Sequence, residues 1–494
     1  MARTRLQKST TDYFSKLSPE ILRSIFSYFC PHCCNEYQWP FGAPPESKRV
    51  QDNTTLYNLC LVSRYFRPFA QEILHHSFDP YYTSWDAPNP WERRLEPFLQ
   101  TIASRPDLAR SVKTVFLKVR LVESLDFDQS RKVFDTCART FGSSAQDVSD
   151  KRHDPRSSTI KRAFFRGTRP PKNMRSRDFI PTAAGQLLSI LVSILPNLDH
   201  IGIEEDRRWQ LDVSPVTLGV LGINSIPLKT LETDYSLPNL LPRTPDLETL
   251  VTSASDWFPN MPCLRNLHIR SRNAVQATTL GHLLSACTGT LSTLSYTSFD
   301  SNIVGIVTLL DKPRFHASLE TLHLDMRHYC DRGNHEMPSL KQFTRLKRLF
   351  LQTYLLYGPK YPTCCEGNCV FKSLVDILPP SIISLELSER TQTPYGRMQN
   401  DLLILAKNVA VDFPQLKEIQ SNADHVCDEY PEALFKSVGV DLIHRDPTLC
   451  CWINTVCRII STVNHAYDSD YDERGCEGGG CGMPLPGELS DEDL

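Results

Sequence analysis

The sequence predicts an α/β fold in two parts: a small module of three helices, followed by a long and irregular array of strand-and-helix repeats. Three apolar stretches with helical spacing occur between residues 15 and 78. After them, one short pattern of apolar positions recurs along the chain. A unit of one strand and one helix cannot bury its own apolar face, so the units must stack. Stacking gives a horseshoe with a parallel inner sheet and outer helices.

The composition is that of a globular protein. Hydrophobic residues make up 40% of the 494 residues and charged residues 22%. The formal net charge is -3, and phosphate binding needs a concentrated basic surface, so we expect no nucleic-acid partner. No apolar stretch approaches the roughly 20 residues that span a bilayer, and the first residues lack the apolar segment of a secretory signal. We therefore expect a cytoplasmic or nuclear protein that does not contact a membrane.

Composition also predicts the domain boundaries. Residues 1–14 are polar and residues 467–494 form an acidic, Gly-rich tail, and we expect both ends to be disordered. The helical module occupies residues 15–78 and the repeats occupy residues 79–466. Residues from about 143–178 form a basic insertion that we expect to be mobile. A solvated loop is the plain interpretation of this insertion, and a nuclear-import signal or a contact with an acidic partner is the alternative.

Local signals define the three helices of the amino-terminal module. Ser18 can cap the first helix, and Pro19 suits its first turn. An insert of about residues 30–53 separates this helix from a second one, which Thr54 or Thr55 can cap. So short a module has a marginal core of its own, and we expect it to pack against the rest of the chain, a partner, or both.

The stretches LSPEILRSIFSYF and LYNLCLVSRYFRPFAQEILHHSF resemble the F-box domain, from Leu17 to about Phe78. F-box domains dock substrate receptors in cullin-RING ubiquitin ligases. The resemblance implies binding to a Skp-type adaptor and, through it, to a cullin scaffold. The chain departs from the family in its Leu-Ser opening, where Leu-Pro is usual, and in the long insert. The positions that match the family's adaptor contacts are Leu17, Pro19, Ile21, Leu22, Ile25, Leu59, Val62, Ser63 and Phe66.

The repeat pattern is apolar-x-x-apolar-x-apolar, as in LRNLHI, LETLHL, LKRLFL and IISLEL. From Leu264 to Leu346 the copies recur at a spacing within the roughly 20–29 residues of leucine-rich repeats, whereas the spacings just before Leu264 are shorter and those after Leu346 are longer. The array is therefore irregular, and it resembles the leucine-rich repeats often found behind F-boxes. Successive copies begin at Val112, Leu198, Leu228, Leu247, Leu264, Leu291, Leu319, Leu346, Ile382 and Leu416. Stretches with helical apolar faces lie between them, for example Leu187–Leu195, Leu280–Cys287 and Leu402–Val411.

Alternation along these strands identifies a candidate binding face. The apolar residues of each copy face the core, so the intervening side chains project from the concave sheet. We expect this face to be exposed and to bind a protein substrate that the sequence does not identify, and a merely solvated face is the alternative. The candidate substrate-binding residues are His268, Arg270, His323, Asp325, Arg348 and Phe350.

Three cysteine clusters raise the question of a metal. They are Cys30-x-x-Cys33 with His32 and Cys34, Cys364-Cys365-x-x-x-Cys369, and Cys476-x(4)-Cys481. A structural zinc site usually combines two paired sets of ligands, and these clusters are far apart in sequence. Thiols in loops, with no metal, are therefore the expectation, and a zinc site that folding assembles is the alternative.

Motifs for catalysis are absent from the sequence. It contains no Gly-x-x-x-x-Gly-Lys phosphate loop, no His-Glu-x-x-His and no Gly-x-Ser-x-Gly. We therefore expect no enzyme activity and no cofactor. The sequence and the family resemblance together predict a substrate-recognition subunit of a cullin-RING (SCF-type) ubiquitin ligase. The alternatives are a repeat scaffold outside any ligase, with the helices as its end cap, and a zinc-supported nuclear binding protein.

Overall fold

The computed structural model of this chain describes most of the module and the repeats. The described residues are 16–34, 46–78, 95–117, 127–140, 176–203, 211–233, 235–253, 258–271, 275–298, 303–326, 337–357, 372–388, 395–422 and 429–444. The amino-terminal segment 1–14, nearly all of the basic insertion and the tail 467–494 lie outside these residues, so their predicted disorder stays a prediction. Among these residues, none of the helices combines the length and the hydrophobicity that a membrane-spanning segment needs.

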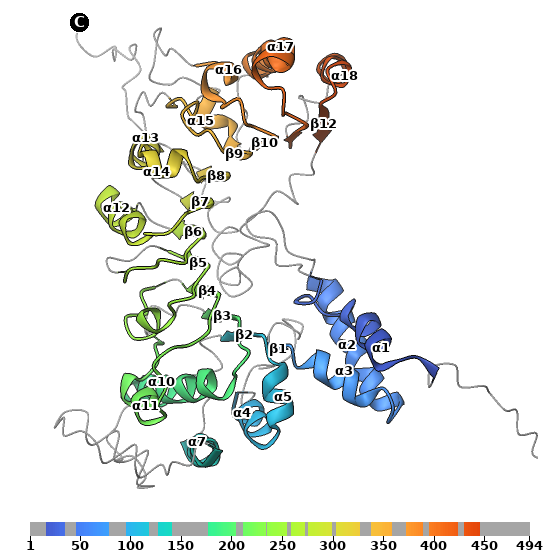
Figure 1. Cartoon of the computed structure of the whole chain (residues 1–494), viewed down its shortest axis with the longest axis vertical. Coiled ribbons are helices and arrows are strands. Elements are labelled where there is room, and N and C mark those ends of the chain that lie inside the picture. The colour runs from blue at the N-terminus through green and yellow to red at the C-terminus, as the bar shows by residue number, and fades with distance from the viewer. Residues whose placement is uncertain are drawn as a thin grey trace, which may run out of the picture.

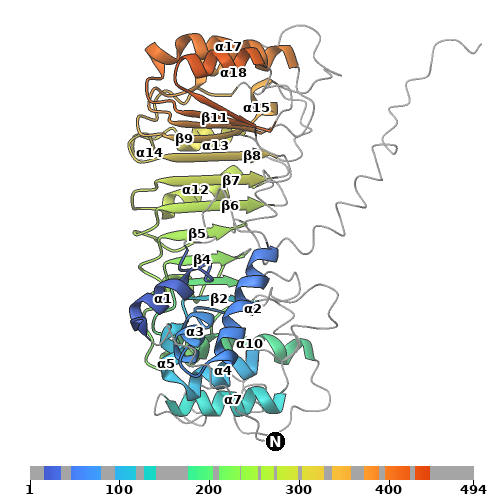
Figure 2. The same ribbon diagram turned by 90° about the vertical axis from the view of Figure 1, so that its right-hand side faces the viewer.

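The strands of the described residues form one parallel sheet of 12 strands in chain order, β1 to β12. They stack along the long axis of the molecule (Figures 1 and 2). Their bounds are β1 Ser77–Phe78, β2 Thr114–Leu117, β3 His200–Ile203, β4 Thr230–Thr233, β5 Thr249–Thr252, β6 Asn266–Ser271, β7 Thr293–Ser298, β8 Thr321–Met326, β9 Arg348–Gln352, β10 Ser384–Ser388, β11 Glu418–Ser421 and β12 Asp441–His444.

Each of the ten predicted copies of the repeat pattern leads into a strand. The first apolar residue of every copy precedes its strand by two positions, as Leu264 precedes β6 and Leu291 precedes β7. The second apolar residue lies inside the strand and is buried, because it faces the helices across the core. The predicted positions of these strands are therefore confirmed. Two further strands, β1 and β12, were not predicted, because β1 has only two residues and β12 lacks the pattern.

The helices cover the side of the sheet that the buried leucines face. Figure 1 shows α12, α13 and α14 along this side of the strands. The bounds in the repeats are α4 Leu95–Ser104, α5 Pro106–Ser111, α7 Phe127–Thr140, α10 Ser176–Ile194, α11 Pro215–Val220, α12 Ala277–Ala286, α13 Ile303–Leu310, α14 Pro313–His316, α15 Thr353–Tyr357, α16 Leu374–Ile377, α17 Tyr395–Asp412 and α18 Glu429–Ser437, with a 3-10 turn at Leu241–Arg243. Helices α10, α12 and α17 hold the three helical stretches that the sequence predicts.

Backbone hydrogen bonds join the repeats at the point where each strand begins. The carbonyl just before a strand accepts the amides of two consecutive residues of the next repeat. The carbonyl of Arg265, for example, accepts from the amides of Ser292 (2.8 Å) and Thr293 (3.0 Å). The carbonyls that accept in this way belong to His76, Lys113, Asp199, Lys229, Glu248, Arg265, Ser292, Glu320, Lys347 and Ile383. This ladder holds each repeat to the one before it without using side chains.

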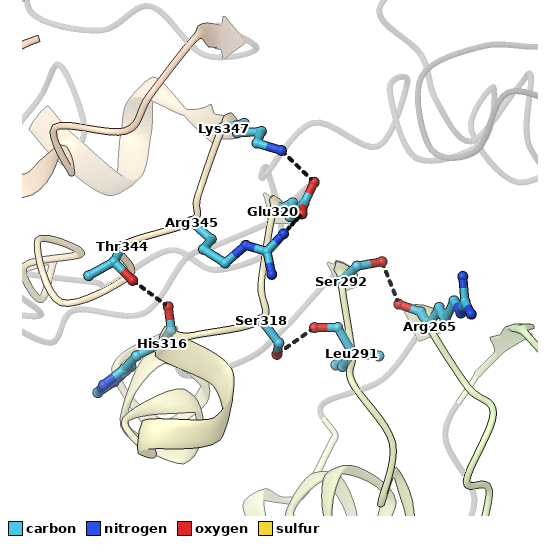
Figure 3. A network of polar contacts seen from close by, with 9 residues as sticks. All are labelled: Arg265, Leu291, Ser292, His316, Ser318, Glu320, Thr344, Arg345 and Lys347. Carbon is cyan, nitrogen blue, oxygen red and sulfur yellow. Dashed lines mark hydrogen bonds and ion pairs between the residues drawn. The ribbon is translucent and has the colours of Figure 1, made fainter. Parts of the chain in front are cut away.

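Side chains reinforce the ladder near β6 to β9 (Figure 3). Ser292 Oγ donates to the carbonyl of Arg265 at 3.2 Å, and Ser318 Oγ donates to that of Leu291 at 2.8 Å. Glu320 forms ion pairs with two cations of the next repeat, Arg345 and Lys347 (Figure 3). The hydrogen bond from Lys347, together with the charges of both cations, holds the pKa of the Glu320 carboxyl below its usual value.

The amino-terminal module has its own small core. Its helices are α1 Pro19–Ser27, α2 Glu46–Val62 and α3 Arg67–Leu74. Ser18 caps α1 as predicted, because its side chain accepts from the amide of Ile21. The buried residues of this core are Leu22, Phe26, Cys30, Leu56, Ala70 and Ile73.

The predicted start of the second helix is wrong. Helix α2 begins at Glu46, so the expected insert of residues 30–53 already contains helix in its last part. Thr55 lies inside α2, and its hydroxyl donates to the carbonyl of Gln51 at 2.9 Å. Threonine can cap a helix, and it can also lie inside one with its hydroxyl bonded to the carbonyl four residues back. The sequence signal at Thr54 and Thr55 was therefore ambiguous.

The module is joined to the repeats through β1. This strand follows α3 closely and pairs with β2. The ring of Phe78 in β1 stacks on that of Phe98 in α4, with centroids 4.1 Å apart. Figures 1 and 2 show the module in front of the amino-terminal end of the sheet, on the face opposite to α12–α14.

We predict that truncating one central leucine destabilises the repeats. Leu267 lies in β6 with no exposed surface, so Leu267→Ala should lower the free energy of unfolding by about 2–5 kcal/mol. The measurement is the shift of the urea midpoint. Val411→Ala is the matched control, since Val411 is exposed on α17, and its effect should stay within about 0.5 kcal/mol. Equal shifts for the two variants would contradict the assignment of Leu267 to the core.

Candidate protein-binding surfaces

Helix α1 carries an exposed apolar stripe. Ile21, Ile25 and Tyr28 recur at helical spacing, and 48%, 40% and 73% of their respective surfaces are exposed. Leu22 and Phe26, on the opposite side of the same helix, fill the module core. The helix is therefore apolar on two sides while the module buries only one of them, and an exposed apolar patch of this kind marks an interaction surface.

The end of α2 presents a second exposed apolar set. Tyr57 and Leu61 lie one turn apart on α2, and Val62 at its last position is 77% exposed. Tyr65 follows in the turn before α3, and its hydroxyl donates to the carbonyl of Leu17 at 3.1 Å. This bond connects the start of α1 with the end of α2, so the two exposed sets belong to one connected part of the module.

The nine predicted adaptor-binding residues divide into three groups. Pro19, Ile21, Ile25 and Val62 are exposed, as docking residues must be. Ser63, Leu17, Leu59 and Phe66 are half-buried, and the last three pack against the module core.

Leu22 is a correction to the predicted set. It is 1% exposed and lies in the core of the module, because it falls on the inner side of α1 one position after Ile21. A partner cannot reach it without unfolding the module. The sequence prediction also missed Tyr28, Tyr57, Leu61 and Tyr65, although their helical spacing from the predicted residues was a usable signal.

The sheet brings five of the six predicted substrate-binding residues into two neighbouring rows. The register aligns His268, Ser295, His323 and Phe350 in one row across β6–β9. Arg270, Thr297 and Asp325 form the next row. Residues that follow one another in a row are also neighbours in space, because adjacent strands lie about 4.8 Å apart. Arg348 belongs to a separate row at the start of the strands.

The expected exposure of these residues is wrong for all but Arg348. His268, His323, Asp325, Phe350 and Arg270 are buried, whereas Arg348 is exposed. Bulky neighbours in the same rows account for part of this burial. The ring of His323 stacks on that of Phe350, with centroids 4.0 Å apart, and its Nδ1 lies 3.1 Å from Ser295 Oγ.

Polar contacts also cross this face of the sheet. Gln352 Nε2 donates to Asp325 Oδ1 at 2.9 Å, between β9 and β8. His200 Nε2 lies 2.6 Å from Glu232 Oε1, between β3 and β4, and both side chains are buried. At its centre, the described part of this face is therefore closely packed with polar and aromatic groups. Exposed side chains on this face belong to the last strands of the stack, at Arg348 in β9 and at Asp441 and Ile443 in β12.

His268 is the most perturbed group on this face. Burial, with the nearby charges of His323 and Arg270, lowers the pKa of its imidazole to about 3. The side chain is therefore neutral in the folded protein throughout the physiological range. An unfolded histidine titrates near pH 6.5, so the folded and unfolded states bind different numbers of protons below that pH.

We predict that His268 makes the protein sensitive to acid. Between about pH 6.5 and pH 3, the unfolded chain binds a proton at this side chain that the folded chain does not bind. The free energy of unfolding should therefore fall as the pH is lowered, by up to about 1.4 kcal/mol per pH unit from this residue. His268→Gln should flatten the slope in urea titrations at pH 4.5–7. His282→Gln, at an exposed position on α12, should keep the wild-type slope, and equal slopes in all three proteins would rule the effect out.

Comparisons with known proteins identify no family. No protein-family model matches the chain, and no curated protein matches it. Among solved structures, the chain is similar to a leucine-rich repeat-containing protein from Legionella pneumophila, at 12% identity with a TM-score of 0.31. The similarity covers 77% of this chain and 97% of that one. At that TM-score the likeness supports no conclusion by itself.

The arrangement of strands and the recurring leucines define the fold class directly. Parallel strands in strict chain order, each preceded by the same apolar pattern and backed by helices, make an α/β solenoid of the leucine-rich repeat type. The fold class that the sequence predicts is therefore confirmed for the repeats.

Proposed function

We propose that this chain is the substrate-recognition subunit of a cullin-RING ubiquitin ligase of the SCF type. The observation that carries the proposal is the exposed apolar surface of α1 and the end of α2, in a three-helix module whose sequence resembles an F-box. The occupant that we propose for it is a Skp-type adaptor, which would connect the chain to a cullin scaffold. The chain itself would be non-catalytic and would bind no cofactor.

The physical basis of adaptor binding would be apolar burial. Ile21, Ile25, Tyr28 and Val62 leave large apolar surfaces in water, and each buried square ångström contributes roughly 25 cal/mol. The hydroxyl of Tyr28 gives that side chain a polar end, as is common in residues that anchor interfaces.

The repeats would supply the second half of the function, the capture of a protein substrate. We propose that the substrate contacts the last strands of the stack, β9 to β12, where Arg348, Asp441 and Ile443 are exposed. Holding the substrate beside the catalytic subunits of the ligase raises its effective concentration there. That increase would be the contribution of this chain to ubiquitin transfer.

We predict that charge on the module surface abolishes adaptor binding. Full-length chain should co-purify with a Skp-type adaptor, whereas Ile25→Asp combined with Val62→Asp should bind at least about 100-fold more weakly, because two apolar contacts become buried charges. Both positions are exposed, so the variant should unfold at the wild-type urea midpoint.

Val411→Asp is the matched control, because it places the same charge on an equally exposed valine of α17. It should bind the adaptor as the wild type does. Failure of the well-folded wild type to bind would overturn the ligase proposal. The module would then be an end cap of a repeat scaffold, a reading that the pairing of β1 with β2 also accommodates.

A further inference from the structure

Four metal-ligating side chains meet where the module joins the repeats. They are Cys30, His32, Cys33 and His76, and one ligand atom from each lies within 4.8 Å of the others. The first three follow the end of α1, and His76 follows the end of α3. Of the cysteine clusters noted in the sequence, only Cys30–Cys34 falls among the described residues. His76, 43 residues beyond Cys33, was not part of the sequence prediction.

The distances between these atoms match a tetrahedral site. Nδ1 of His76 lies 3.2 Å from Cys33 Sγ and 3.6 Å from Cys30 Sγ. Nδ1 of His32 lies 3.8 Å from Cys33 Sγ. Zinc bonds of about 2.3 Å to sulfur and about 2.0–2.1 Å to nitrogen place tetrahedral ligands roughly 3.3–3.8 Å apart. The four atoms therefore need only small shifts to surround one ion.

Backbone hydrogen bonds hold the ligands in place from both sides. The amide of Cys30 donates to the carbonyl of Ser27 at 3.0 Å, and that of Cys34 donates to the carbonyl of Cys30 at 3.0 Å. These bonds form a tight turn that carries three of the ligands. On the other side, the amide of His76 donates to the carbonyl of Ile73 at 3.0 Å. The turn and the end of α3 are thus fixed independently of any ion.

We propose that Cys30, His32, Cys33 and His76 form a structural zinc site. Two thiolates and two imidazoles are the ligand set that zinc prefers, whereas magnesium and calcium prefer oxygen. Four protein ligands complete the tetrahedron and leave no position for a reacting water, so the site is structural and not catalytic. Cys30 is buried and Cys33 is exposed, which gives the ion a route in from solvent.

Thiolates, not thiols, bind metals, so zinc would displace the proton of each ligand thiol on binding. Cys34 differs from its neighbours, because its thiol donates to the carbonyls of Ser27 and Tyr28 at 3.5 Å each and lies outside the four-residue group.

The position of His76 gives the site a mechanical role. Its ring lies among the thiols, while its carbonyl accepts from the amides of Lys113 (2.8 Å) and Thr114 (2.9 Å). This carbonyl is the first step of the ladder that joins the repeats. An ion bound here would connect the end of α1 to the start of the sheet and fix the direction in which the exposed stripe of α1 points. The proposal does not depend on which partner binds that stripe.

The test is the zinc content of the purified full-length chain, prepared with zinc and a reductant and then dialysed. About one zinc per chain is expected in the wild type, measured by plasma mass spectrometry. Cys33→Ser and His76→Gln should each lower the zinc affinity by more than the roughly 10–100-fold that loss of an outer-shell partner causes. Chelation of the wild type should lower its melting temperature, and added zinc should restore it.

The neighbouring residues provide matched controls. Cys34→Ser and His75→Gln alter the same two residue types one position away, and both variants should keep one zinc per chain. If a ligand variant fails to fold, cobalt titration of the wild type decides, because two thiolates in a tetrahedral site give intense visible and charge-transfer bands. The proposal is overturned if the folded wild type binds no zinc or cobalt, if both ligand variants retain zinc, or if Cys30 and Cys33 form a disulfide in the zinc-treated protein.

Discussion

The ladder of backbone hydrogen bonds at the strand starts is the constraint on which the rest of the structure depends. At each strand start from His76 through Ile383, one carbonyl accepts two consecutive amides of the next repeat, and the parallel pairing of the strands continues from that point. Because only backbone atoms take part, the side chain at that position is free to vary, and so is the chain between two steps. This tolerance explains how strands separated by very different lengths of chain belong to one stack. The chain between β4 and β5, which begin at Thr230 and Thr249, is much shorter than that between β2 and β3, which begin at Thr114 and His200.

The same ladder explains which parts of the fold the sequence predicts. A strand of the stack needs buried apolar residues at fixed positions, so Leu264, Leu291 and their equivalents reveal ten strands from pattern alone. No such need applies at the ends. β1 is two residues long, and three of the four residues of β12 are exposed, so neither leaves a pattern to detect. The start of α2 was missed for a related reason, since a threonine inside a helix and a threonine at its cap look alike in sequence.

The candidate sites show a sharper limit, because periodicity predicts the face on which a side chain lies but not what covers that face. Alternation placed His268, His323 and Phe350 on the concave face and predicted that they are exposed. The register aligns them in one row across the strands, yet these residues are buried. On α1, the family resemblance assigned the buried Leu22 to the docking surface together with the exposed Ile21 and Ile25. The cluster of thiols and imidazoles shows a further limit of prediction from sequence, because residues distant in the chain can meet in space. Cys30, His32 and Cys33 are adjacent in sequence, whereas His76 reaches them only because α1 and α3 pack together.

The two proposals meet at this junction. A receptor that works by proximity must hold its two binding surfaces at a fixed separation, since the gain in effective concentration falls when the connection between them is loose. In this chain β1 connects the module to the sheet, but it contributes a pairing of only two residues with β2, and the stacking of Phe78 on Phe98 adds one aromatic contact. Packing of α3 on α5 is a further link between the module and the repeats. His76 lies directly before β1, so a tetrahedral ion between the end of α1 and His76 would attach α1 to the start of this connection, and α1 could then not move relative to β1 without breaking a metal–ligand bond.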